Sequence, residues 1–182
     1  MLCTRFKWNK NISIINDKLK ELAYFDGLTG VYNRNAFFEK LDKRFKNIAK
    51  KEGYPLILVD FDHFKSINDT YGHIAGDKVL QKIITMIKGI LPKNSILGRY
   101  GGDEFLIQPG FILEKDLKKV IEKIIRDVNK LKIKYQDDFI NISISIGIAF
   151  YNNEIDYNTW IQRADSALYE VKEMGRNNYK IK

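Results

Sequence analysis

The sequence predicts an α+β fold of the ferredoxin-like, or palm-like, type: an antiparallel sheet with helices on one face, preceded by an N-terminal helix. Three observations support this class. Apolar segments follow one another in the order strand, helix, strand, strand, helix, strand (βαββαβ). A Gly-Gly pair separates two short apolar runs, which is typical of a tight hairpin. The 182 residues are 45% hydrophobic, a composition that suits one compact domain.

The segment before the sheet is expected to be a linker or signalling helix over residues 1–25. Its apolar residues fall three and four apart, as on one face of a helix: Ile12, Ile15, Leu19 and Leu22. This face can pair with a second copy of the chain or pack on the domain, and two heptads do not decide between the two. The main domain is expected over residues 26–182. It opens with a glycine-containing turn, followed by a helix from Asn35 to about Lys51.

The first half of the sheet begins at Pro55. The apolar run at residues 56–59 predicts a strand that is buried on both faces and ends at Asp60. The next elements are expected to be a helix and the two strands of a hairpin, over residues 76–91, 96–100 and 105–107.

The second half contains the clearest strand, over residues 140–148. Isoleucine alternates there with small polar residues, which predicts one isoleucine face and one small, polar face. Helices are expected on either side of this strand, over residues 114–131 and 156–174, and an edge strand over residues 179–181.

Composition narrows the classes of function. Cys3 is the only cysteine and supplies neither an internal disulfide nor a metal cluster, so we expect a cytoplasmic setting. No apolar run reaches the ~18 residues of a membrane span, and we expect no direct membrane contact. The net charge of +8 admits nucleic acid, an acidic membrane or a polyphosphate. Its lysines are scattered, which is typical of a solvated surface and disfavours nucleic acid.

Three or four carboxylates are expected near one edge of the sheet. Asp60 and Asp62 end the first strand and project from the same face if the chain stays extended, while Asp103 and Glu104 follow the Gly-Gly turn. Acidic residues also occur at strand ends simply because these places are exposed to solvent. Both pairs together, however, favour a two-metal phosphoryl-transfer site, because Mg²⁺ prefers carboxylate oxygens. The glycines would let a phosphate approach the backbone closely.

The run Arg99–Phe105 contains Gly-Gly-Asp-Glu-Phe and resembles the signature of the GGDEF family of diguanylate cyclases. Further blocks resemble the family's entry motif, metal block, guanine block and closing helix, in the same order: residues 26–34, 60–69, 72–77 and 167–177. The resemblance extends from about Asp26 to the C-terminus. It implies an enzyme that condenses two GTP molecules into cyclic di-GMP.

The resemblance also implies roles for the acidic residues. Asp60, the backbone carbonyl of Phe61, and Asp103 would hold two Mg²⁺ ions, with Mn²⁺ as a possible substitute. Glu104 belongs to the same acidic turn and is a further candidate ligand. Either Asp103 or Glu104 would deprotonate the attacking 3′-hydroxyl.

Substrate contacts are implied at several other positions. Asn68 and Asp77 match the family's guanine contacts, and a carboxylate suits the N–H donors of guanine. Without the resemblance, these two residues read as a turn residue and a helix N-cap. Lys172 and Arg176 are four residues apart, so they are expected to share a helix face and to hold the β- and γ-phosphates; a helix C-terminus also favours cations without any function.

The remaining candidates are Lys65, as a weaker phosphate contact, and Gly101 and Gly102, where the nucleotide would approach the turn. The family pattern implies one GTP per protomer and a homodimer for turnover, with control by an upstream sensor domain if the chain is a fragment of a longer protein. The alternatives are a catalytically silent module that senses GTP or cyclic di-GMP, a cyclase of altered base choice, and a palm-like nucleotidyltransferase. One departure concerns product inhibition: many relatives carry Arg-x-x-Asp where this chain has Pro92-Lys93-Asn94-Ser95, so no inhibition of that type is expected.

Overall fold

A computed structural model describes residues 18–19, 21–47, 53–154 and 156–182. Most of the predicted N-terminal helix, including Ile12 and Ile15, lies outside these residues. Within them, residues 18–19 and 21–24 are helical, and the side chains of Leu19 and Leu22 are 57% and 77% exposed. None of the described helices combines the length and the apolar composition needed to cross a membrane.

The main sheet has five strands in the order β2-β3-β1-β6-β7. The pairs among the first four are antiparallel, whereas β7 runs parallel to β6 at the edge. The first four strands in this order confirm the ferredoxin-like arrangement, and the predicted edge strand is present. The bounds of the strands are β1 Pro55–Phe61, β2 Ile96–Gly101, β3 Glu104–Gln108, β6 Ile144–Phe150 and β7 Tyr179–Ile181.

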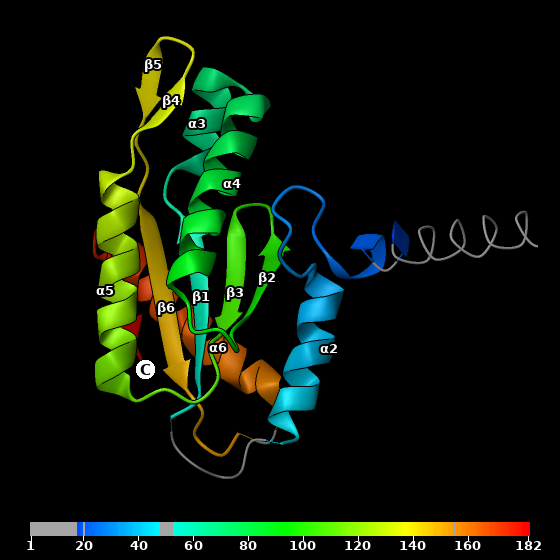
Figure 1. Ribbon diagram of the computed structural model, residues 1–182. Helices are drawn as coiled ribbons and strands as arrows, with labels where there is room; N and C mark the ends of the chain where they lie inside the picture. The colour runs from blue at the N-terminus through cyan, green and yellow to red at the C-terminus, as the bar shows by residue number, and fades with distance from the viewer. Residues whose placement is uncertain (1–17, 20, 48–52, 155) are drawn as a thin grey trace, which may run out of the picture.

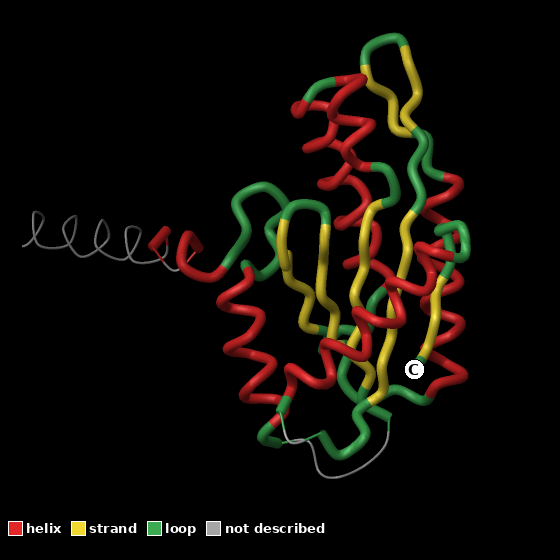
Figure 2. Tube along the Cα trace, turned by 180° about the vertical axis from the view of Figure 1, so that it is seen from behind, coloured by secondary structure: helices red, strands yellow, loops and turns green. Residues whose placement is uncertain are grey.

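Helices cover both faces of this sheet, so the expectation of helices on one face is wrong. Figures 1 and 2 show the two layers, which comprise α4 (His73–Ile90) and α5 (Glu114–Lys130) on one side and α2 (Arg34–Phe45) and α6 (Tyr157–Glu173) on the other. Alternate side chains of β1 explain this arrangement. Ile57 and Val59 belong to the core beneath α4 and α5, whereas Leu56 and Leu58 belong to the core beneath α2 and α6.

Strand β6 brings α6 unusually close to the sheet. Ile144, Ile146 and Ile148 face α4 and α5, as the alternation predicts. The opposite face carries small residues because α6 lies directly on it. A Cβ atom on Gly147 would lie 2.1 Å from the backbone oxygen of Ala164 in α6, so only glycine fits there.

Several boundaries differ from the prediction. The strand expected over residues 140–148 starts at Ile144, because the preceding residues form a separate hairpin of β4 (Ile133–Tyr135) and β5 (Asp138–Ile140). Figure 1 shows this hairpin projecting beyond the end of the main sheet. Helix α2 ends at Phe45 rather than near Lys51, and residues 48–52 are outside the described ones.

The segment between β1 and β2 contains two helices rather than one. Helix α3 (Phe64–Tyr71) was not predicted, and α4 begins at His73 instead of Gly76. Gly72 separates them with φ +81°, a backbone conformation that favours glycine. The two helices thus form a compact corner directly after β1.

Candidate active site

Two of the acidic residues are brought together where β1 and β3 lie side by side. Asp60 of β1 pairs directly with Glu104, the first residue of β3. Asp103 precedes Glu104 in the turn that joins β2 to β3. Cross-strand partners in an antiparallel pair have Cβ atoms about 5 Å apart. The fold therefore brings Asp60 to the Asp-Glu pair that lies 43–44 residues further along the chain.

Burial and the repulsion between carboxylates raise pKa values in this cluster. Burial raises the pKa of Asp60, and the charges of Asp103 and Asp62 raise it further, while Lys172 opposes them. Burial also raises the pKa of Glu104, with the charge of Asp60 as the next cause. The fold therefore disfavours the ionised forms of Asp60 and Glu104 relative to free carboxylates in water.

The Gly-Gly turn is held in place from the N-terminal side of the domain. The β2–β3 register shifts between Arg99 and Gly101, and Gly102 has φ +28°. The guanidinium of Arg99 donates two hydrogen bonds to the Gly102 carbonyl oxygen, at 2.9 and 2.7 Å, and its Nη1 lies 3.2 Å from Oδ2 of Asp26. Arg99 thus connects the entry turn to the acidic turn. Neither motif by itself indicates this contact, because Asp26 and Arg99 lie 73 residues apart in the sequence.

The Asp26 carboxylate accepts hydrogen bonds from both Thr29 and Arg99. Burial alone would raise its pKa, but two hydrogen bonds from Thr29 and the charge of Arg99 outweigh burial, and the pKa of Asp26 is lowered. The ionised form is therefore the stable one in the folded chain.

Lys172 of α6 reaches the acidic cluster from the face of the sheet that α6 covers, the face toward which Leu56 and Leu58 of β1 also point. Its Nζ lies 2.8 Å from Oδ2 of Asp60. Arg176 does not lie on the same helix face, contrary to expectation, because α6 ends at Glu173 and Arg176 has φ +68° beyond it. Its Nη1 remains 3.5 Å from the Lys172 carbonyl oxygen.

Asp62 is not a free member of the cluster. Its Oδ1 accepts a 2.7 Å hydrogen bond from the Ser145 hydroxyl, and its Oδ2 accepts bonds from the Ser143 hydroxyl (2.6 Å) and the Asn177 backbone N–H (3.1 Å). With 4% exposure, Asp62 joins β1, β6 and the segment after α6. The two serines of the alternating segment were the only sequence signal for this role.

The two expected guanine contacts lie at the corner between α3 and α4. Asn68 is inside α3, and its Oδ1 lies where a Cβ on Gly76 would come within 2.0 Å. Asp77 is the neighbour of Gly76 and is exposed in the second turn of α4. The alternative readings as turn residue and N-cap are therefore wrong, because Gly72 precedes α4 and makes no side-chain cap.

The candidate phosphate contact Lys65 and the candidate carbonyl ligand Phe61 both lie close to the end of β1. Lys65 is exposed near the start of α3. Phe61 is the last residue of β1, with its ring buried. Its backbone therefore lies next to Asp60 at the same end of the strand.

The donor set suits a hard divalent cation. Asp60, Asp103 and Glu104 supply carboxylate oxygens, and these are the ligands that Mg²⁺ and Mn²⁺ prefer. Among the residues that the structure describes, no three acidic, histidine or cysteine side chains converge closely enough to hold an ion. Lys172 neutralises Asp60 instead. The chemistry of these side chains thus fits a hard divalent cation, whereas one carboxylate oxygen of Asp60 is paired with the Lys172 ammonium.

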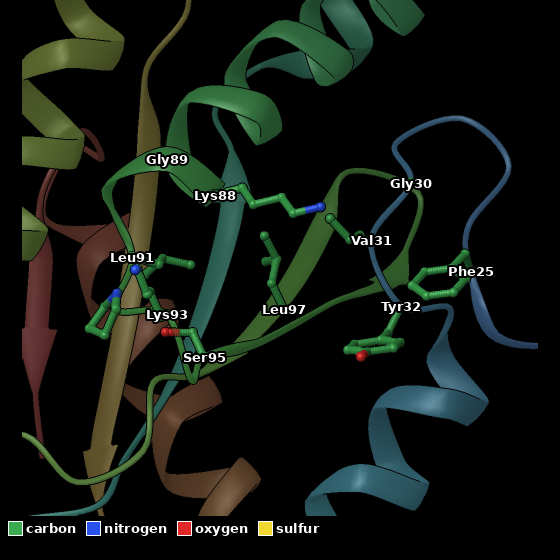
Figure 3. Close-up of a pocket in the computed structure, with 11 residues that line it drawn as sticks. Phe25, Gly30, Val31, Tyr32, Lys88, Gly89, Leu91, Lys93, Ser95 and Leu97 are labelled. Atoms are coloured by element: carbon green, nitrogen blue, oxygen red, sulfur yellow. The ribbon is translucent and has the colours of Figure 1, made fainter. Parts of the chain in front are cut away.

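A separate cavity of about 360 Å³ lies between the entry turn, the end of α4 and the start of β2. Figure 3 shows Phe25 and Tyr32 on one side, and Lys93 and Ser95 on the other. The two aromatic rings stack with centroids 5.1 Å apart. The charged residues among its described lining residues are Lys88 and Lys93. The stretch that lacks Arg-x-x-Asp thus borders a basic and apolar cavity.

Comparison with known proteins identifies relatives over most of the chain. Diguanylate cyclase A of Treponema denticola is 37% identical over 171 residues, which are 91% of this chain and 46% of that protein. Diguanylate cyclase DosC of Escherichia coli K12 is 38% identical over 177 residues, which are 93% of this chain and 38% of that protein. The chain thus spans less than half the length of these two curated relatives.

Solved structures are similar in fold as well. The coiled coil and GGDEF domain of DgcB from Caulobacter crescentus, in complex with c-di-GMP, matches with a TM-score of 0.90 and 28% identity, covering 100% of this chain and 97% of that one. Diguanylate cyclase SiaD of Pseudomonas aeruginosa, in complex with its activator SiaC, matches with a TM-score of 0.84 and 29% identity, covering 98% and 69%. The family model "Diguanylate cyclase, GGDEF domain" matches residues 23–178, and the chain belongs to this family.

Proposed function

We propose that this chain is a diguanylate cyclase domain that converts two GTP molecules into cyclic di-GMP and two pyrophosphates. The observation that carries the proposal is the direct pairing of Asp60 with Glu104 beside the Gly-Gly turn, with Lys172 at 2.8 Å. This arrangement combines carboxylates that can bind a metal ion with a lysine ammonium that can bind phosphate. The curated relatives, which are named diguanylate cyclases, support the same reaction.

The acidic end of the sheet would hold the metal and the reacting groups. Two Mg²⁺ ions, bound by Asp60, the Phe61 carbonyl, Asp103 and Glu104, would offset charge on the triphosphate and on the departing pyrophosphate. One of the two turn carboxylates, Asp103 or Glu104, accepts the proton of the attacking 3′-hydroxyl. Gly101 and Gly102 leave room for the nucleotide at the turn.

Basic residues on two sides would position the triphosphate. Lys172 and Arg176 bind the β- and γ-phosphates, since the Arg176 guanidinium remains close to the end of α6. Lys65 is exposed on α3 and adds a further cation toward the phosphates.

The α3–α4 corner would select guanine. Asn68 and Asp77 face the purine, and the Asp77 carboxylate accepts hydrogen bonds from the N–H donors of the guanine pairing edge. Adenine lacks this pair of donors, so it would leave a carboxylate unmatched. The enzyme should therefore reject ATP.

Turnover requires two protomers, because each has one guanine site and each 3′-hydroxyl attacks the α-phosphate of the other GTP. The exposed Leu19 and Leu22 side chains support pairing through the N-terminal helix. The reaction would take place in the cytoplasm, and the greater length of the relatives supports control by a further sensor segment.

The decisive experiment incubates the protein with Mg²⁺ and either GTP or ATP, followed by separation of the products. We expect cyclic di-GMP from GTP, no cyclic product from ATP, and loss of the product with Asp60→Asn. GTP binding without turnover at any protein concentration would instead identify a silent sensing module. A cyclic product from ATP would overturn the assignment of Asn68 and Asp77.

The altered stretch at residues 92–95 gives a prediction about regulation. The cavity beside it contains Lys88 and Lys93 and has no described carboxylate in its lining, so the Arg-x-x-Asp type of product site cannot form there. Initial rates measured at rising cyclic di-GMP should show no potent noncompetitive inhibition. Such inhibition at low product concentration would contradict this prediction.

A further inference from the structure

Lys172 lies where a counter-ion for the acidic cluster is needed. Its ammonium is 2.8 Å from Asp60, and the two side chains are only 31% and 12% exposed. Asp62 and Asp103 act on Asp60 through their charges, while Asp103 and Asp165 act on Glu104. The charge of Lys172 opposes this repulsion at both Asp60 and Glu104. Lys172 therefore lies within the acidic cluster, in addition to being a candidate phosphate contact.

We propose that Lys172 competes with the divalent metal for Asp60, so that the metal and the triphosphate bind in a coupled way. This inference rests on the proposed function, because it takes Asp60 as a metal ligand and Lys172 as a phosphate contact. Lys172 blocks the metal site when nucleotide is absent, and it leaves Asp60 for the phosphates when nucleotide arrives with metal.

The coupling follows from the charges. A divalent ion on Asp60 repels an ammonium that lies within hydrogen-bond distance of the same oxygen. A metal ion alone must therefore displace Lys172 from a buried carboxylate and leave the ammonium without this partner. A triphosphate supplies new anionic oxygens for that ammonium. Metal with nucleotide thus avoids a cost that metal alone incurs.

The fold allows this movement without rearranging the backbone. Neighbouring residues of α6, Leu168 and Val171, are buried with 2% exposure each, and Gly147 lets α6 lie directly on β6. The Lys172 backbone is therefore fixed. Its flexible four-carbon side chain is the part that is free to move between Asp60 and a phosphate.

A matched control is available in a second ion pair of α6. Lys180 of β7 forms an ion pair with Glu170 of α6. This pair also joins a lysine to a carboxylate, but it involves none of the candidate ligands. Lys180→Met therefore removes one positive charge and one α6 ion pair without touching the acidic cluster.

The test measures Mn²⁺ binding by electron paramagnetic resonance, with and without a GTP analogue that carries a methylene bridge between its α- and β-phosphorus atoms. Lys172→Met should bind Mn²⁺ alone about ten-fold more tightly than the unmodified chain, a factor within the usual range of coupling between sites. The analogue should tighten Mn²⁺ binding in the unmodified chain and in Lys180→Met. In Lys172→Met this tightening should be reduced by a similar factor.

The proposal is overturned if Lys172→Met binds Mn²⁺ alone no more tightly than the unmodified chain. It is also overturned if the double variant Asp60→Asn/Lys172→Met binds Mn²⁺ as tightly as Lys172→Met does, since the ion then lies elsewhere. Lys172→Gln replaces Lys172→Met if the latter fails to give the circular dichroism spectrum of the folded chain. The experiment measures Mn²⁺ binding and no turnover. A chain that makes no cyclic di-GMP can therefore still show the tighter Mn²⁺ binding of Lys172→Met, and an active cyclase can fail to show it.

Discussion

Asp60 and Asp62 lie two residues apart at the end of β1, and the fold treats them in opposite ways. Asp62 is almost fully buried and accepts hydrogen bonds from Ser143, Ser145 and Asn177. Asp60 meets other carboxylates and is neutralised by a single lysine. A buried charge with complete hydrogen bonding supports the structure, whereas a charge with a replaceable partner is available for chemistry.

The largest expected effect is on activity at Asp60. Asp60→Asn should lower the rate of cyclic di-GMP formation by about 10³-fold, because a metal ligand contributes several kcal/mol to transition-state stabilisation. The unfolding free energy should change by less than about 1 kcal/mol, since burial already disfavours the charge at this position. Product assays and urea unfolding measure the two quantities. A large loss of stability with retained activity would reverse the roles of the two aspartates.

Asp62 should show the opposite pattern. Asp62→Ala removes the acceptor of three hydrogen bonds. It should lower the unfolding free energy by at least about 3 kcal/mol, because a single bond to a charged group contributes about 1.5–3 kcal/mol. Urea unfolding at neutral pH checks this value. A variant as stable as the unmodified chain would show that Asp62 does not join β1 to β6 and to the segment after α6.

The next effect concerns the contact that positions α6 and therefore Lys172. Gly147→Ala places a Cβ 2.1 Å from the Ala164 backbone oxygen and 2.4 Å from the Leu168 nitrogen, and overpacking of this kind costs about 2 kcal/mol or more. Gly89→Ala in α4 is the control, because nothing lies within 4 Å of its Cβ; it should stabilise the chain by up to about 1 kcal/mol. Equal melting temperatures for the two variants would contradict the close packing of α6 on β6.

The smallest effect is the pH dependence of the Asp26–Arg99 contact. The pKa of Asp26 is lowered, so its ionised form adds stability above the pKa of the unfolded chain, and this contribution disappears as the pH falls through the folded-state pKa. Asp26→Asn should therefore cost about 1 kcal/mol at neutral pH and nothing in strong acid. Urea unfolding at several pH values measures this difference. A cost that stays constant down to about pH 3 would show that the charge is not its source.

The sequence predicted the elements of the sheet well but not the layers around it. Apolar runs and the Gly-Gly pair located β1, β2 and β3 within one or two residues, because these are local signals. Helix α3 was missed because its eight residues contain one buried side chain, Ile67. The β4–β5 hairpin was missed because the isoleucine alternation continues across two separate elements.

The site was predicted in composition but not in its contacts. The positions of Asp60, Asp103 and Glu104 follow from strand ends and a turn, which the sequence reveals. The bonds from Ser143 and Ser145 to Asp62 span 81 and 83 residues, and the ion pair of Lys172 with Asp60 crosses from α6 to β1. No local pattern indicates such pairings, because they depend on how the elements pack.

The most direct test of the catalytic proposal is a crystal structure of the chain with Mn²⁺ and the methylene-bridged GTP analogue, with the ions located by anomalous scattering. Mn²⁺ bound by Asp60 and the Asp103–Glu104 turn, with the Lys172 ammonium on the phosphates, is the predicted result. Manganese bound elsewhere, or Lys172 still paired with Asp60 beneath a bound nucleotide, would contradict it.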